Sequence, residues 1–407
     1  MSSKRRVIND PVFGFINIPN EFIYDIIQHP YLQRLNRIRQ LGVTSFVYPG
    51  AQHTRFHHSI GAMYLMNEAL KNLKEKGHDI SKDEYNGALA AILLHDVGHG
   101  PFSHILEYTL VKNIHHEEIS LLLMQQLNKE WNGTLQTAIE IFTDTYPKHF
   151  LHQLVSGQLD VDRLDYLRRD SFFTGVNEGN IGSARIIKMM DVRNDHLVID
   201  SKGIYSIENF LLSRRLMYWQ VYLHKTAVAA EKMLINTLTR AKELTAQGEK
   251  LFASPSLSYF LEKDATLADF ENNGKALQHF VNLDDNDIWS ALKVWTSHPD
   301  KVLSLLSNGM VNRKLFKIEI TRKKQDPSRI EEFVKKYQRK YNLSEHEARY
   351  LISHDVISTN MYSQEEESID ILYNDGSIKD ISLASDMLNP ELLSKKIGKY
   401  YFAYLRD

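Results

Sequence analysis

Residues 89–104 read LAAILLHDVGHGPFSH, an apolar stretch that ends in ligand-type side chains. The segment Tyr85 to Leu94 is rich in alanine and leucine and predicts a buried helix, which places His95 and Asp96 side by side at its end. Burying an imidazole beside a carboxylate costs free energy unless a partner such as a cation satisfies both. The structural alternative is a helix end followed by loop histidines. It does not explain why an apolar helix ends in so many ligand-type side chains.

Three further motifs surround this one in the chain. They are HTRFHHS at residues 53–59, HHEE at 115–118 and DVDRLDY at 160–166. Asp162, Tyr166 and Asp170 are spaced four apart, so a helix would carry them on one face. Imidazoles and carboxylates without thiolates suit Fe, Mn, Co, Ni or Zn. Mg²⁺ or Mn²⁺ can join where phosphate oxygens supply further ligands.

A long amphipathic helix is predicted from Ser206 to Leu238. Arg214, Tyr218, Tyr222 and Lys225 would share one of its faces. Core packing explains the tyrosines but not the two cations, whereas phosphate recognition explains both. At this point both interpretations stay open.

Helical periodicity from about residue 20 to 350, with short peripheral strand signals, predicts a mainly α-helical protein with a small α+β region at its C-terminal end. The chain has 407 residues, no cysteine and a net charge of −2, which fits a reducing cytoplasm and argues against nucleic acid as more than a weak partner. We expect no membrane partner, because no long apolar run is present. We expect three regions, an N-terminal segment (1–45), a catalytic core (46–240) and a C-terminal helical and α+β region (241–407). Short strands are expected at Val12–Ile18, Leu197–Tyr205, Leu315–Thr321, Ile369–Tyr373, Ile378–Ile381 and Tyr400–Leu405, the last beside the preceding hairpin.

Together the motifs resemble the HD-domain superfamily, and within it the deoxynucleoside triphosphate (dNTP) triphosphohydrolases, most closely the catalytic core of the SAM-and-HD-domain dNTPases. The likeness runs from Arg6 to about Lys225. It implies the metal ligands His58, His95, Asp96 and Asp162, and the catalytic residues His99, His104, His116, Glu117 and Glu107. His104 would donate a proton to the departing sugar oxygen. Glu107 stands where the family has an aspartate.

The resemblance also implies a substrate site. Phosphates would be bound by Arg55, Arg163, Tyr166, Arg214 and Lys225, with Arg163 replacing a family lysine. Gln40 and Asp170 would hold the 3′-hydroxyl. Leu41 and Tyr222 would crowd the 2′ position and reject ribose.

The N-terminal segment resembles the family's activator-nucleotide site. The residues concerned are Arg6, Val7, Asn9, Gln28, Gln33 and Asn36. Gln28 and Asn36 replace a guanine-reading aspartate and arginine, and amide side chains suit adenine, so we expect a dNTP activator other than dGTP, such as dATP. A segment without any regulatory role is the alternative. Relatives imply a homotetramer.

The expected activity is metal-dependent hydrolysis of dNTPs, dGTP among them, to a deoxynucleoside and inorganic triphosphate. An HD phosphohydrolase acting on nucleoside monophosphates or cyclic nucleotides is one alternative. A nucleotide- or nucleic-acid-binding module without activity is another. The sequence predicts no role for the C-terminal region.

Overall fold

The apolar segment before the HD pair forms α4 (Lys82–Leu94), and its residues from Gly87 to Leu94 are all buried. Ser81 and Glu84 begin this helix with a reciprocal capping box. The computed structural model describes residues 6–102, 104–271, 274–359, 368–387 and 397–406. α4 packs against α3 (Arg55–Glu75), which in turn packs against α9 (Val161–Thr174). These three helices form the centre of the N-terminal half, which contains every predicted catalytic residue and is named the catalytic half for that reason.

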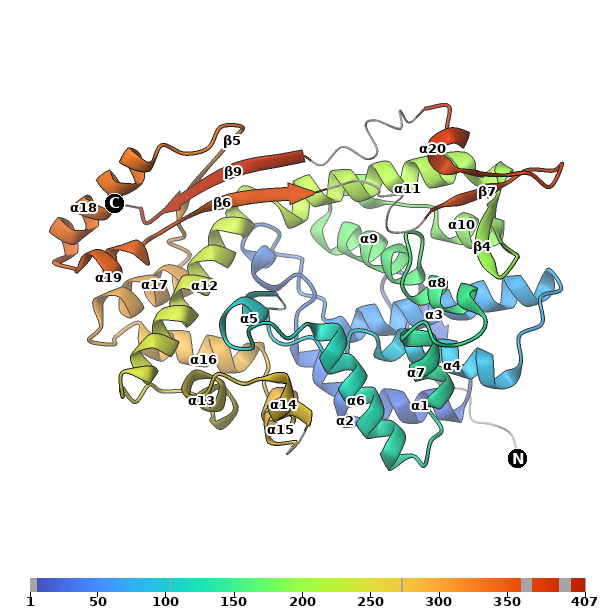
Figure 1. Cartoon of the computed structure of the whole chain (residues 1–407), viewed down its shortest axis with the longest axis horizontal. Coiled ribbons are helices and arrows are strands. Elements are labelled where there is room, and N and C mark those ends of the chain that lie inside the picture. Colours follow the sequence, from blue (N-terminus) through green and yellow to red (C-terminus); the bar gives the residue numbers. More distant parts are fainter. Residues whose placement is uncertain (1–5, 103, 272–273, 360–367, 388–396, 407) are drawn as a thin grey trace.

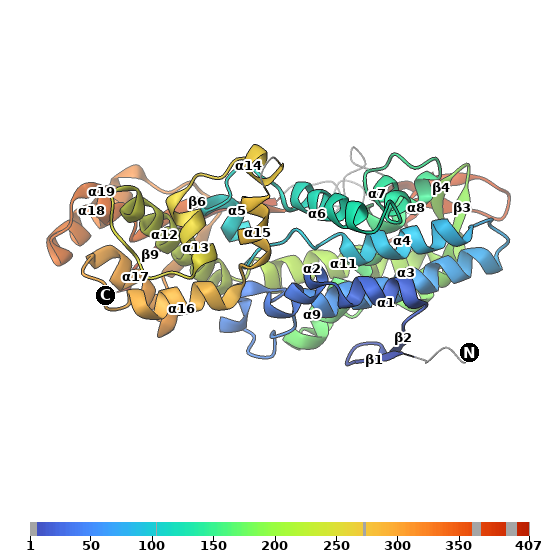
Figure 2. The ribbon, with the colours of Figure 1, turned by 90° about the horizontal axis from the view of Figure 1, so that it is seen from below.

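The helices around this centre are mostly short. They are α1 (Glu21–Gln28), α2 (Pro30–Gln33), α5 (His104–Thr109), α6 (His116–Glu130), α7 (Gln136–Phe142), α8 (His149–Val155) and α10 (Ser183–Met189). Figures 1 and 2 show an elongated, flattened molecule in which most of these helices lie toward one end, whereas α5 lies near the middle, against α12 (Lys225–Ala246). Short 3₁₀ segments, η1 (Arg34–Arg37) and η2 (Gly42–Phe46), connect α2 to α3.

The prediction of a single helix from Ser206 to Leu238 is wrong, because this segment forms two helices. α11 (Ile204–Met217) runs into a π-helical turn (Tyr218–Tyr222), and α12 (Lys225–Ala246) begins after a break. His224 has extended backbone, and its ring accepts a hydrogen bond from the Thr226 N–H as an N-cap. Arg214 and Lys225 therefore lie on different helices.

The remaining helices lie in the C-terminal part. They are α13 (Pro255–Glu262), α14 (Leu267–Glu271), α15 (Lys275–Val281), α16 (Asp285–Trp295), α17 (Lys301–Val311), α18 (Pro327–Tyr341), α19 (Glu345–Arg349) and α20 (Ile381–Ala384). α12 packs against α13 and α17, so it joins this part to the catalytic half. The boundary expected near residue 240 falls inside α12, and the division into domains stays a prediction.

Short strands lie at the edges of the molecule. β1 (Val7–Asp10) and β2 (Gly14–Asn17) form a hairpin, so the expected strand at Val12–Ile18 is shorter. The four-stranded sheet has the order β3 (Met190–Arg193), β4 (His196–Asp200), β7 (Asp370–Leu372), β8 (Ile378–Asp380). The strand expected to reach Tyr205 ends at Asp200, because the Asp200 side chain accepts the Lys202 N–H and starts a helical turn.

The third sheet has the order β5 (Lys317–Thr321), β9 (Ile397–Tyr404), β6 (Ile352–Thr359). The predicted hairpin β7–β8 is confirmed, but the strand near Tyr400 does not extend it. Residues 401–405 are buried, including side chains on both faces of β9, which is typical of a central strand. β9 therefore pairs with two neighbours, β5 and β6.

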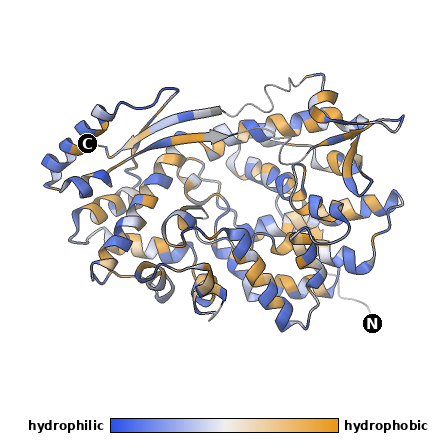
Figure 3. Cartoon of the chain, in the orientation of Figure 1, coloured by the Kyte–Doolittle hydropathy of each residue, from blue (hydrophilic) through white to orange (hydrophobic). Residues whose placement is uncertain are grey.

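Hydrophobic and hydrophilic residues are interspersed along the helices (Figure 3), and the buried hydrophobic residues form one core cluster. The many helices and few small sheets confirm the mainly α-helical fold class. Among the described residues, no helix is both long and apolar enough to cross a bilayer.

Candidate functional site

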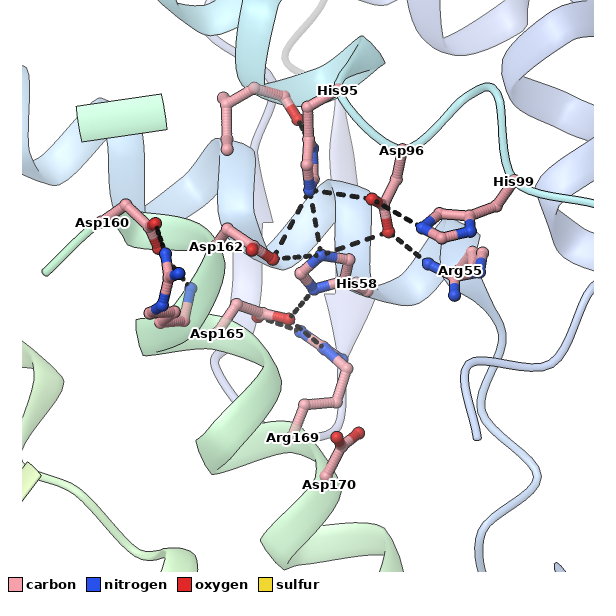
Figure 4. Close-up of polar contacts among 12 residues, drawn as sticks. Arg55, His58, His95, Asp96, His99, Asp160, Asp162, Asp165, Arg169 and Asp170 are labelled. Carbon is pink, nitrogen blue, oxygen red and sulfur yellow. Dashed lines mark hydrogen bonds and ion pairs between the residues drawn. The ribbon is translucent and has the colours of Figure 1, made fainter. Parts of the chain in front are cut away.

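Three helices bring the predicted metal ligands together. His58 lies in the first turn of α3, His95 and Asp96 end α4, and Asp162 lies in the first turn of α9 (Figure 4). Gly61 permits the close approach of α3 and α9, because a Cβ added there would lie 2.0 Å from the Asp165 carboxylate. Four side chains from three distant segments of the sequence thus meet at one point.

The ligand atoms of this group are close to one another. His58 Nε2 lies 3.4 Å from His95 Nε2 and 3.0 Å from Asp162 Oδ1. Asp96 adds carboxylate oxygens at 3.3 Å from His95 Nε2 and 3.8 Å from His58 Nε2. Two ligands of one ion, each about 2.1 Å from it, lie roughly 3.0 to 3.4 Å apart. The spacing of His58, His95 and Asp162 therefore fits a single metal ion, with the Asp96 carboxylate beside it.

The other ring nitrogens fix how both imidazoles point. His58 Nδ1 lies 2.7 Å from Asp165 Oδ2, and His95 Nδ1 lies 2.6 Å from the Ile92 carbonyl oxygen. A carbonyl oxygen can only accept, so His95 Nδ1 carries the proton. With Nδ1–H donated on both rings, both Nε2 atoms face the same point, where a metal ion that displaces any proton on them can accept their lone pairs. These residues fit a divalent metal ion.

A buried chain of charges continues outward from His58. Asp165 accepts two hydrogen bonds from Arg169 at 2.9 Å, and Arg169 donates to Asp10 at 2.7 Å. All three side chains are at most 3% exposed. Neither Asp165 nor Arg169 was predicted from the sequence to have a role. The sequence does show that Asp165 and Arg169 are four residues apart, as in an ion pair on a helix, and that Asp165 follows Asp162 by three residues. Such a spacing more often marks a solvated ion pair on a helix surface.

The electrostatics of the group favour a cation. Burial alone would lower the pKa of His58, but hydrogen bonds to Asp162 and Asp165 outweigh it and raise that pKa to about 10. Burial alone would raise the pKa of Asp162, yet His58 and His95 hold it below its usual range. The carboxylates thus stay ionised and create a negative potential that attracts a positive charge.

Asp96 also belongs to a second group, with His99 and His116. His99 Nε2 lies 3.3 Å from Asp96 Oδ1, and the rings of His99 and His116 stack at 3.7 Å. Glu107 and Glu117 approach His116 Nδ1 at 3.2 and 3.3 Å. Burial and the charge of Arg55 hold the pKa of His99 well below its usual value, so its imidazole is neutral. The structure brings four predicted catalytic residues together, and the side chain of the fifth, His104, lies outside the described part.

Two of the predicted phosphate-binding arginines contact carboxylates next to the metal group. Arg55 is buried, and its Nη1 donates to Asp96 Oδ2 at 2.5 Å. Arg163 points to the start of α9, where it donates to Asp160 and to the Gly157 carbonyl. Asp160 in turn caps α9 by accepting the Arg163 N–H at 2.7 Å.

Asp170 is the centre of a second polar cluster, two turns along α9. His53 Nε2 lies 2.7 Å from Asp170 Oδ1, and the Tyr222 hydroxyl donates to Asp170 Oδ2 at 2.7 Å. His53 stacks on Phe173, and Tyr166 contacts Tyr222 edge to face. His53 belongs to the HTRFHHS motif, but no role was predicted for His53 from the sequence.

The Gln40 loop lies beside this cluster. The Gln40 N–H donates to the His53 carbonyl at 3.0 Å, and Arg39 forms an isolated β-bridge with Thr54. Gln40 Oε1 is buried and makes no hydrogen bond to the described residues. Leu41 follows and packs against the core. Gln40 and Leu41, two of the four residues predicted to contact the sugar, therefore follow Arg39, which pairs with Thr54 of the HTRFHHS motif.

The two cations of the predicted phosphate stripe differ in burial. Arg214 is 9% exposed and donates to Gln158 Oε1 at 3.1 Å. Lys225 is exposed in the first turn of α12. The break between α11 and α12 separates them, so the structure does not show the continuous stripe that the helix prediction implied.

The residues of the expected activator site lie on the surface around α1, α2 and the N-terminal hairpin. Arg6 pairs with Glu21 at 2.7 Å and stacks on Tyr24 at 3.3 Å. Gln33 accepts a hydrogen bond from Asn36 at 3.2 Å and donates to the Ile27 carbonyl. The other three residues, Val7, Asn9 and Gln28, are exposed.

A helical body that directs two histidines and two aspartates of an H…HD…D pattern to one point defines a metal-binding hydrolase of the HD class. Residues 55–170 match the HD domain, and residues 181–254 match the HD associated region. The chain belongs to the HD-domain phosphohydrolase family.

The chain is similar to uncharacterized proteins and to proteins named as triphosphohydrolases. The uncharacterized protein YwfO of Bacillus subtilis is 35% identical over 322 residues, which cover 77% of this chain and 72% of that protein. The deoxynucleoside triphosphate triphosphohydrolase SAMHD1 of Homo sapiens is 28% identical over 294 residues, covering 61% and 47% of the two chains. The SAMHD1 homolog of Dictyostelium discoideum is 30% identical over 265 residues, covering 60% and 51%. The chain spans about half the length of these SAMHD1 relatives.

Solved structures show the same fold. A phosphohydrolase from Bacteroides thetaiotaomicron has a TM-score of 0.96 and 62% identity, and the match covers 99% of this chain and 100% of that one. A hypothetical protein from Aquifex aeolicus has a TM-score of 0.72 and 26% identity, with coverage of 99% and 97%.

Proposed function

We propose that this protein hydrolyses dNTPs, dGTP among them, to a deoxynucleoside and inorganic triphosphate. The observation that carries the proposal is the arrangement along α9. Asp162 in the metal group and Asp170 in the polar cluster share one helix face and are about 12 Å apart along the axis. A nucleotide with its phosphates at Asp162 would have its sugar near Asp170, whose carboxylate can accept a hydrogen bond from a hydroxyl group.

The proposed reaction needs a nucleophile, a proton donor and cations that hold the phosphates. A transition metal such as Fe, Mn, Co, Ni or Zn on His58, His95, Asp96 and Asp162 would lower the pKa of bound water and supply hydroxide. Water oxygen adds to the α-phosphorus, the bond to the 5′-oxygen breaks, and that oxygen takes a proton. We assign the proton to His104 and the phosphate contacts to Arg55, Arg163, Arg214 and Lys225.

The Asp96, His99 and His116 group supports a second cation. The shared Asp96 carboxylate, with the imidazoles of His99 and His116, can hold Mg²⁺ or Mn²⁺ when phosphate oxygens complete the shell. In this proposal Glu107 and Glu117 orient His116 through its Nδ1.

The N-terminal residues support a regulatory proposal. Gln28 and Asn36 are both exposed, and their amides can both donate to and accept from adenine. We propose that a dNTP other than dGTP, such as dATP, binds there in a homotetramer. Size-exclusion chromatography with and without dATP tests it, and activation by dGTP alone would contradict it.

Product analysis tests the proposed activity. Each dNTP and each ribonucleotide is incubated with the protein, singly and as mixtures, with Mg²⁺ or Mn²⁺. Ion-pair chromatography should then show a deoxynucleoside and triphosphate in equal amounts. Turnover seen only in mixtures would identify an activator. Turnover of monophosphates or cyclic nucleotides alone, by protein shown to contain metal, would replace the proposed substrate.

A further inference from the structure

The start of α16, in the C-terminal part, contacts two loops of the catalytic half. Asp285 is 4% exposed, and its Oδ2 accepts the Arg39 N–H at 3.0 Å. The backbone N–H of Phe102 also favours the ionised form of this carboxylate. Arg39 precedes Gln40 and Leu41, and Phe102 ends the described part of the HDVGHGPF loop. The Asp285 carboxylate thus interacts with a backbone N–H of each loop.

Trp289 reinforces this contact one helical turn later. Its ring meets Phe46 at 6.0 Å and Phe102 at 6.1 Å, both edge to face. Asp285 and Trp289 are four residues apart, so they lie on the same face of α16. The two loops also approach each other, because a Cβ on Gly42 would lie 3.6 Å from the Phe102 ring.

Neighbouring residues tie the segment 280–285 to the same loops. Arg34 is 1% exposed and donates to the carbonyls of Val97 and His99 at 2.9 Å. It also donates to the carbonyls of Phe280 and Val281 at 3.3 and 3.2 Å. Arg37 pairs with Asp284 at 2.5 Å. Several directional hydrogen bonds and an ion pair therefore fix the position of α16 relative to the HDVGHGPF loop.

Phe102 has a backbone conformation that needs such support. Its φ is +54°, in the left-handed region that a bulky side chain rarely adopts. A bulky residue held there is strained and persists only when its surroundings enforce it. Packing against Trp289 and Gly42 encloses the Phe102 ring, which is buried.

We propose that Asp285 and Trp289 are positioning residues, which hold the Arg39–Leu41 loop against the Phe102 loop and thereby place Gln40 and Leu41 for substrate binding. This gives the C-terminal part a role in catalysis. The substrate named in the test rests on the proposed function, whereas the contact itself does not.

Steady-state kinetics of Asp285→Ala and Asp285→Asn test the proposal, with Ser290→Ala as the control on an exposed position of the same helix. Because small misplacements of a binding loop are costly, kcat/KM for a dNTP should fall roughly 10- to 100-fold in Asp285→Ala. The preference for dNTP over ribonucleotide should fall as well. Asparagine keeps an acceptor for the Arg39 N–H, so Asp285→Asn should lose less. Unchanged kcat/KM and sugar preference in folded Asp285→Ala would overturn the proposal.

Hydrogen exchange separates this proposal from the proposed function. Peptides covering residues 38–46 and 97–102 should exchange faster in Asp285→Ala than in the wild-type protein, while α6 should not change. No difference in these peptides would overturn the positioning role, whatever the substrate. Faster exchange in a protein that hydrolyses no dNTP would overturn only the proposed function. If Asp285→Ala does not fold, Asp285→Asn carries the same measurement with a smaller expected difference.

Discussion

Asp165 lies between a metal-ligand histidine and a buried arginine. It accepts from His58 Nδ1 on one side and from Arg169 on the other, and it is fully buried. A carboxylate in this position fixes the ring tautomer and makes Nε2 a better metal ligand. The metal affinity of the site therefore depends on a residue that need not touch the metal.

We predict that Asp165→Asn lowers metal affinity about 10- to 100-fold, because asparagine removes the charge that stabilises the oriented imidazole. Metal content after dialysis against a graded series of chelator concentrations measures this. Asp160→Asn is the matched control, since Asp160 is equally buried on the same helix but faces Arg163. Equal metal retention in both variants would contradict the assigned role.

Asp285 makes stability depend on pH. Burial raises the pKa of this carboxyl to about 6, although the N–H and the charge of Arg39 and the N–H of Phe102 lower it and Asp284 adds to the rise. A raised carboxyl pKa means that stability is fully present below the unfolded pKa, near 3.8, and is lost as pH rises through about 6.

Asp285→Asn should therefore gain stability over the wild-type protein as pH rises from about 4 to 6, by about 1.4 kcal/mol per pH unit. Above pH 6 the difference should level off. Urea unfolding at closely spaced pH values measures it. Parallel pH profiles of the two proteins would show that Asp285 does not carry this penalty. A variant that is more stable at pH 7 yet less active would separate its stabilising and positioning effects.

At the scale of elements, the crossing of α3 and α9 decides whether the site forms. Gly61 lies at this crossing, and an added Cβ would lie 2.0 Å from Asp165 Oδ1 and 2.1 Å from Arg169 Nη2. Both atoms belong to buried side chains with little room to move. The absence of a side chain at residue 61 thus permits the hydrogen bond between Asp165 and His58.

Gly61→Ala should destabilise the protein by about 1–3 kcal/mol, the usual range for overpacking, and should weaken metal binding at the same time. Differential scanning calorimetry and metal analysis measure the two effects. Gly182→Ala is a matched control, because a Cβ there meets its nearest neighbour only at 4.0 Å. Loss of stability with unchanged metal affinity would show that α9 shifts without disturbing the ligands.

Sequence patterns predicted elements whose signals are local, and missed those decided at long range. α4, α9 and the β7–β8 hairpin follow from apolar runs, spacing and turn residues. The break before α12 has no proline or glycine to mark it, since an extended His224 and a π-helical turn produce it. The pairing of β9 with β5 and β6 depends on contacts between distant segments, which periodicity does not encode.

The candidate site shows the same division. The H…HD…D motif located His58, His95, Asp96 and Asp162, and the structure brings them within reach of one ion. Asp165 and Arg169 were missed, because burial distinguishes a structural relay from a surface ion pair and burial depends on the packing of α3.

At the scale of the whole molecule, the metal group connects α3, α4 and α9, which pack as one core. A ligand that binds only the folded state stabilises it by about 2.7 kcal/mol at one hundred times its dissociation constant. Metal binding at this site should therefore raise the melting temperature of the entire catalytic half and not of a local segment.

We predict that adding Mn²⁺ to chelator-treated protein raises its melting temperature, and that Asp162→Asn abolishes most of the rise, because it removes a ligand contributed by α9. Calorimetry at several Mn²⁺ concentrations measures this. Histidines elsewhere supply a control, since the His149 ring contacts the rings of His152 and His196 outside the H…HD…D motif. Substituting His149 and His152 with alanine should leave the rise intact. A rise that disappears in this control but persists in Asp162→Asn would place the stabilising metal outside the HD motif, and the hydrolytic centre would then need another location.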